Sequence, residues 1–136
     1  SLRAAVDAEP ESVMARLRLG DHYQFFKRDM DAAEQQYLAA LASKKMDKRA
    51  LMSYAEFTWQ VRAQIDIASK YFERAAAAYK NDADVQNRVG IFHEFALGAI
   101  PAAEAAYRKA ADAKQTKQAR ATTLGNIARV LKAQRR

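Results

Sequence analysis

Apolar and polar positions along the chain follow the period of amphipathic helices, and a shift of 35 residues brings several of these positions into register. One recurring feature is a large apolar residue followed by a small one: Leu19-Gly20, Tyr54-Ala55, Val89-Gly90 and Leu124-Gly125. A second feature is an alanine, an aromatic residue four positions later and an alanine three positions after that: Ala33-Tyr37-Ala40, Ala68-Phe72-Ala75 and Ala103-Tyr107-Ala110. These offsets place the members of each set on one helical face. Because aromatic residues make up only 10% of the sequence, three of them in register indicate a true repeat.

The repeat predicts pairs of helices that are joined by short turns. An acid or a proline follows an apolar residue at the expected start of each second helix, in Met30-Asp31, Ile65-Asp66 and Ile100-Pro101. Such residues suit the first turn of a helix, because this end of the helix dipole is positive and the N–H groups there have no partner within the helix. We expect helices at about 12–28 and 31–43, 48–63 and 66–79, 83–97 and 101–113, and 117–134. Acids in the turns between them, such as Asp29 and Asp82, are explained by capping.

Composition supports a soluble all-α protein. The 136 residues are 50% apolar and 29% charged, with only four glycines and two prolines. No cysteine is present, which excludes disulfides and thiolate metal sites, and no apolar run is long enough to span a membrane. These features do not identify a compartment, so an intracellular location, in the cytoplasm or nucleus, is only the default expectation.

Two of the repeat units carry recognisable family patterns. The first unit, with Leu19-Gly20-Tyr23 and Ala33-Tyr37-Ala40, resembles tetratricopeptide repeats. The middle unit is similar to half-a-tetratricopeptide (HAT) repeats, which occur in assemblies that process RNA; it reads Tyr54-Ala55-Glu56-Phe57, Ala68 and Tyr71-Phe72-Glu73-Arg74-Ala75. The resemblance extends over almost the whole chain. It implies a right-handed α-solenoid of antiparallel helix pairs that acts as a scaffold.

We therefore expect one repeat domain over residues 1–136. It would contain three full repeats with a period of 35 residues and a half-repeat at each end. Residues 1–10 would end a preceding helix, the repeats would cover about 12–46, 47–81 and 82–116, and a terminal helix would cover about 117–134.

The resemblance also predicts a partner-binding groove on the concave face, lined by the first helix of each pair. The expected lining residues are Leu17, Asp21 and Gln24; Met52, Glu56, Trp59 and Gln60; and Asn87, Ile91 and Glu94, with Phe25 and Phe95 beside them. Trp59 is the only tryptophan and could anchor a partner, although packing against the adjoining unit is the favoured interpretation. Met52 and Phe25 are likewise expected to be core residues and not partner contacts.

Positive charge gathers in the last part of the chain. The whole chain carries a formal charge of +7, of which residues 108–136 contribute +8. The expected basic patch consists of Arg108, Lys109, Lys114, Lys117, Arg120, Arg129 and Lys132. Such a patch can attract nucleic acid, an acidic protein or an anionic surface. It is also typical of a solvated helix face, and it lacks the interleaved aromatic residues that stack on single-stranded bases.

Catalytic chemistry has little support in the sequence. His22 and His93 are the only histidines, and they form no HExxH motif. No glycine-rich phosphate loop or GxSxG turn is present. We expect a non-enzymatic scaffold, without cofactor or metal, that binds a peptide or helix of another protein. The alternatives are an RNA-associated scaffold that uses the basic end, and self-association through the terminal half-repeats; no membrane partner is expected.

Overall fold

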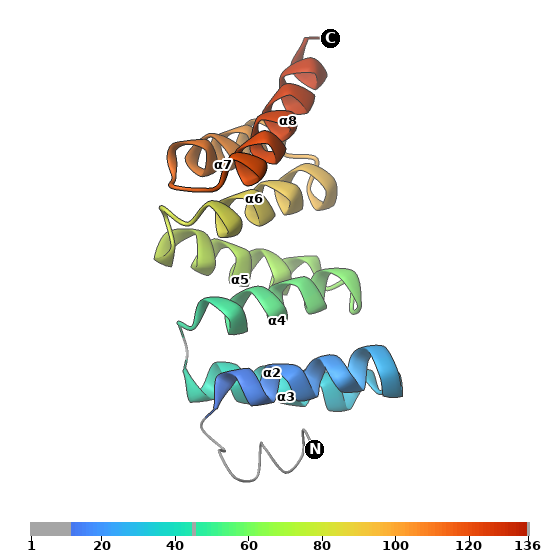
Figure 1. The fold of residues 1–136 in the computed structure, drawn as a ribbon. Helices are drawn as coiled ribbons and strands as arrows, with labels where there is room; N and C mark the ends of the chain where they lie inside the picture. Colours follow the sequence, from blue (N-terminus) through green and yellow to red (C-terminus); the bar gives the residue numbers. More distant parts are fainter. Residues whose placement is uncertain (1–11, 45, 136) are drawn as a thin grey trace. The chain divides into compact units, whose positions relative to one another are not determined.

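The computed structural model describes residues 12–44 and 46–135, and these residues form helices joined by short turns (Figure 1). No strand occurs among them, so the predicted all-α fold is confirmed. The expected helix over residues 1–10 lies outside the described residues. The coordinates divide into two compact units, one up to Tyr71 and one from Phe72 onward, and each is described by itself.

The first unit contains two helix pairs, the second of which continues past the division. Helix α2 (Val13–His22) runs on into a π-helical turn, η1 (Tyr23–Lys27), and then returns as α3 (Met30–Ser43). Helix α4 (Lys48–Gln60) follows, and then α5 (Ile65–Ala78), within which the division between the units falls. Side-chain caps begin α2, α3 and α4, where Ser12, Asp29 and Asp47 each accept a hydrogen bond from a backbone N–H three residues later.

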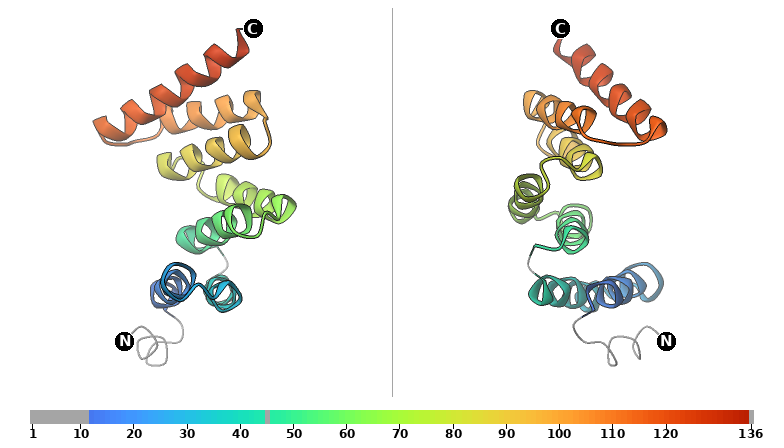
Figure 2. Two further views of the ribbon diagram at one scale, coloured as in Figure 1. Left: turned by 90° about the vertical axis from the view of Figure 1, so that its right-hand side faces the viewer. Right: turned by 60° about the vertical axis from the view of Figure 1, so that its left-hand side comes forward.

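The second unit repeats this plan. Helix α6 (Ala83–Ile91) continues into the π-helical turn η2 (Phe92–Ala96), and α7 (Ile100–Asp112) packs back against it. Helix α8 (Lys117–Gln134) lies beside α7 (Figure 2). Asp82 and Thr116 cap α6 and α8, so the expected capping role of Asp29 and Asp82 is observed. Ala103 and Tyr107 of α7 form a buried cluster with Ile127 and Val130 of α8.

The turn inside each helix pair has the same backbone conformation. Arg28, Ala63 and Gly98, spaced 35 residues apart, have positive φ angles of 55°, 54° and 63°. In each case the N–H of the next residue bonds to the carbonyl six positions earlier: Asp29 to Tyr23, Gln64 to Thr58 and Ala99 to His93. The left-handed residue is similar to the one that ends a helix in a Schellman motif, but the hydrogen bond spans one residue more than the bond of that motif. Two of the three left-handed positions are not glycine, which is why the sequence pattern did not reveal them.

The repeating residues form the core. The six alanines of the repeat pattern are fully buried, and Tyr37, Phe72 and Tyr107 are at most 2% exposed. Gly20 and Gly90 lie directly beneath the rings of Tyr37 and Tyr107, so close that a Cβ atom would overlap the ring. Small residues are therefore needed where the helices of a pair cross. The fourth occurrence of the pattern differs: Leu124 and Gly125 of α8 are exposed.

Candidate partner-binding surface

In the first unit, the buried Tyr37 fixes the polar end of the predicted groove. Its hydroxyl donates to Oδ1 of Asp21 at 2.7 Å and lies 2.8 Å from Oε1 of Gln24. Burial, together with the hydrogen bond to the Asp21 carboxylate, raises the pKa of Tyr37 far above its ordinary value. Asp21 nevertheless remains exposed, so its second oxygen can face a partner.

The other predicted lining residues of this unit are of two kinds. Leu17 and Met52 are only 5% and 4% exposed, so they contribute to packing, whereas Phe25 is 60% exposed and its expected core role is wrong. Glu56 and Trp59 are half-buried and Gln60 is exposed. Half-burial of Trp59 is compatible both with packing and with contact to a partner, so its role as a partner contact remains a prediction. The accessible residues are thus Asp21, Gln24, Glu56, Trp59 and Gln60.

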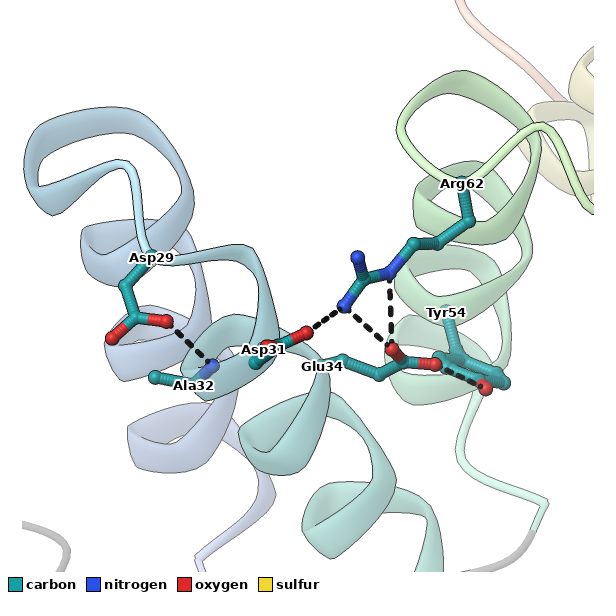
Figure 3. Close-up of polar contacts among 6 residues, drawn as sticks. All are labelled: Asp29, Asp31, Ala32, Glu34, Tyr54 and Arg62. Carbon is teal, nitrogen blue, oxygen red and sulfur yellow. Dashed lines mark hydrogen bonds and ion pairs between the residues drawn. The ribbon is translucent and has the colours of Figure 1, made fainter.

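A polar network that was not predicted joins α3 to α4 (Figure 3). The guanidinium of Arg62 lies 2.6 Å from Oδ1 of Asp31 and 3.0 Å from Oε1 of Glu34, and Tyr54 donates to Oε2 of Glu34 at 3.0 Å. Burial and the Glu34 carboxylate raise the pKa of Tyr54 to about 12. Arg62 also lies over the ring of Phe57, 5.5 Å from its centroid. The network connects one helix pair to the next within this unit, which is a structural role.

In the second unit the predicted Glu94 is held by two partners. Tyr107 donates to its Oε1 at 2.8 Å, and Arg129 of α8 binds both carboxylate oxygens at 2.7 Å. The hydrogen bonds from Arg129 lower the pKa of Glu94, because they favour the ionised carboxylate. Arg129 also lies 5.3 Å from the ring centroid of Phe95, which is 61% exposed. A predicted groove residue and a predicted basic-patch residue therefore form one ion pair.

A cavity of about 570 Å³ lies in the second unit, beside the starts of α6 and α8. Its lining includes Asn87, which was predicted for the groove, and Lys114, which was predicted for the basic patch. The amide nitrogen of Asn87 donates to the hydroxyl of Thr123 at 2.8 Å. Its amide oxygen is buried and has no hydrogen-bond donor among the described residues. The remaining lining residues are Asn81, Asp82, Ala83, Asp84, Gln115, Thr116, Ala119 and Thr122, while the predicted Ile91 lies elsewhere and is half-buried.

The basic patch is divided by its ion pairs. Arg108 pairs with Glu104 at 2.7 Å, and Arg129 pairs with Glu94. The other five cations form no ion pair within the described part of the chain: Lys109, Lys114, Lys117, Arg120 and Lys132. These five residues are exposed, which keeps them available to an anionic partner.

The two histidines have packing environments. His22 stacks against Phe26 with 5.6 Å between the ring centroids. His93 is half-buried, and burial lowers its pKa. Residues 12–44 and 46–135 contain no group of three or more potential metal ligands. The same ranges hold no helix with the length and hydropathy that a membrane crossing needs.

Comparison with known proteins defines the class of fold. A scan of protein-family models and a search of curated proteins both give no match. Among solved structures, PilF of Pseudomonas aeruginosa superposes with a TM-score of 0.77 at 20% identity, over 98% of this chain and 59% of that one. PilW, described as a widely conserved type IV pilus biogenesis factor, has a TM-score of 0.72 at 21% identity, over 96% of this chain and 64% of PilW. MamA has a TM-score of 0.65 at 17% identity, over 98% of this chain and 84% of MamA.

The chain therefore has a tetratricopeptide-like helical repeat fold. The chain spans less than two thirds of the length of PilF and of PilW. At these identities the likeness establishes the fold and does not extend to the activity of those proteins.

Proposed function

We propose that this chain is a non-enzymatic interaction module that binds a peptide or helix of a partner protein on the face formed by the first helices of its pairs. The observation that carries the proposal is the cavity of the second unit, which is lined by Asn87 of the first helix α6 and by residues at the start of α8. The amide nitrogen of Asn87 donates to the hydroxyl of Thr123, which holds this side chain in place. An extended peptide is a suitable occupant of such a cavity beside a first helix.

The cavity lining contains both signs of charge. Asp82 caps α6 and Asp84 is paired with Arg88, whereas Lys114 forms no ion pair among the described residues. Lys114 can therefore pair with an acidic side chain of the peptide. In the first unit, Trp59 is half-buried and has the polar residues Glu56 and Gln60 near it in the sequence. This combination suits a peptide that presents both an apolar and a polar side chain.

The test begins with an unbiased library of displayed peptides, selected on the folded chain. Binding of the selected peptides is then measured for Asn87→Ala and Trp59→Ala, with Gln35→Ala on the exposed side of α3 as the matched control. We expect the first two variants to lose about tenfold in affinity or more, and the control to bind normally. Circular dichroism confirms that each variant is folded. If the selected peptides bind both groove variants as tightly as they bind the parent chain, the proposed groove is not their binding site.

The RNA-associated alternative is supported by one observation, the five exposed cations without ion pairs. RNA binding through several cations weakens steeply as salt rises. An apolar contact with a peptide responds much less. A titration of a mixed-sequence RNA at low and at physiological salt distinguishes the two functions, and absence of binding at low salt excludes RNA. Self-association, the third hypothesis, predicts a molecular mass by light scattering that increases with protein concentration.

A further inference from the structure

Helix α8 has an apolar face that no described residue covers. Ile127 and Val130 point toward α7, while Leu124 and Leu131 are 51% and 38% exposed on another side of the helix. The helix lies beside α7, and its opposite side is open in the described structure (Figure 2). Ala121, Gly125 and Ala128 are also exposed and follow the helical spacing of the two leucines. We call these five residues the Gly125 face.

The register of the repeat indicates what the Gly125 face can receive. Gly20 and Gly90, at the same position of the first helix, each lie under the tyrosine ring of a second helix. At Gly20 an added Cβ atom would come within 2.6 Å of Cε1 of Tyr37, whereas at Gly125 it would meet nothing within 4 Å. The Gly125 face therefore has space for an aromatic ring, and no described residue occupies that space.

Charge selects the kind of helix that fits. Every charged side chain of α8 is a cation: Lys117, Arg120, Arg129 and Lys132. Arg129 is neutralised by Glu94, and the other three form no ion pair among the described residues. A second copy of the Gly125 face would bring like charges together, which opposes pairing of two copies through α8. An acidic helix would find complementary charges along the same edge.

We propose that the Gly125 face docks an acidic amphipathic helix of a partner protein, with an aromatic residue of that helix over Gly125. Small residues four before and three after the aromatic residue would allow close approach, as Ala33 and Ala40 do around Tyr37. This surface is separate from the groove described above. Arg129, which faces Glu94, lies roughly 140° around the helix from Leu124.

The chain itself supplies a defined probe, a synthetic peptide with the sequence of residues 29–43. It contains Ala33, Tyr37 and Ala40, and its charged residues are all acids: Asp29, Asp31 and Glu34. A fluorescent form of this peptide is titrated with the folded chain, and anisotropy reports binding. The matched control peptide carries alanine in place of Tyr37, and we expect it to bind at least tenfold more weakly. Raising the salt concentration should weaken binding of the parent peptide.

Two variants of the chain locate the binding site. Gly125→Leu fills the space for the ring on an exposed helical position, so the fold is kept while peptide binding falls at least tenfold. Gln35→Ala, on the exposed side of α3 in the first unit, should leave binding unchanged. Peptide binding that survives Gly125→Leu, or no binding by the parent chain, overturns the proposal. A dimer of the chain that Gly125→Leu abolishes would identify a second copy as the occupant and would also overturn it.

Discussion

The same substitution at two equivalent glycines is expected to change stability in opposite directions. Gly90 and Gly125 occupy one position of the 35-residue repeat, each inside a helix. Alanine stabilises a helix interior by about 1 kcal/mol relative to glycine. At Gly125 the new methyl group meets nothing within 4 Å, so Gly125→Ala should increase the free energy of unfolding by the full amount.

At Gly90 the new methyl group would overlap the ring of Tyr107, with Cδ1 only 2.6 Å away. The ring is fully buried, and its hydroxyl is bonded to Glu94 at 2.8 Å, so it cannot swing aside without breaking other contacts. Overpacking of this kind costs about 1–3 kcal/mol, and the severity of the overlap places it near the upper value. After the helix gain of about 1 kcal/mol is subtracted, Gly90→Ala should lower the free energy of unfolding by about 2 kcal/mol.

Urea denaturation followed by circular dichroism measures both variants against the parent. Helical repeats can unfold in more than one step, so the midpoint of each transition is compared separately. We expect the two variants to differ by about 3 kcal/mol in total. If Gly90→Ala raised the midpoint as Gly125→Ala does, the argument that Tyr107 requires a glycine beneath it would be incorrect.

Three further measurements test the packing, the turns and the buried hydroxyls. Phe72 is 1% exposed and stacks on Phe92, with 4.5 Å between the ring centroids. Phe72→Ala should therefore lower the free energy of unfolding by about 3–5 kcal/mol, and a thermal melt like that of the parent would contradict this. Ala63 has a φ of 54°, so Ala63→Gly should relieve strain and stabilise the chain by about 0.5–1 kcal/mol in urea denaturation, while the same change at the helical Ala77 should destabilise it. The pKa of Tyr54 is raised to about 12, so the stability that its neutral form provides is complete below about pH 10 and is lost as the pH rises toward 12. The part of an ultraviolet titration that Tyr54→Phe removes reports Tyr54, and it should appear together with unfolding; if that part appeared near pH 10 in the folded chain, it would argue against the hydrogen bond to Glu34.

Much of the local structure follows from the sequence. The helices begin and end close to the expected positions, because capping acids and apolar periodicity are properties of neighbouring residues. The residues of the repeat, such as Tyr37, Phe72 and Tyr107, are buried as their register predicts. Groove positions were harder to assign, because Leu17 and Met52 are buried and Glu94 is engaged by Arg129. Sequence spacing alone does not state how far a side chain on a helix face is covered.

Side-chain partners far apart in the chain were decided only by the tertiary structure. Arg62 and Asp31 are separated by 31 residues, and no local pattern specifies that they meet. One signal in the sequence was available: Glu34 and Glu104 occupy the same position of the repeat, and in the structure both bond to a side chain outside their own helix. The sequence also did not predict the π-helical turns or the left-handed backbone of Ala63. Packing of the helix pair holds Ala63 in a conformation that alanine does not favour. The sequence by itself thus determined the helices, their period and their buried faces, because these depend on residues a few positions apart. The tertiary structure decided which polar groups are satisfied within the chain and which positions stay uncovered, such as the space above Gly125, because these depend on residues far apart in the sequence.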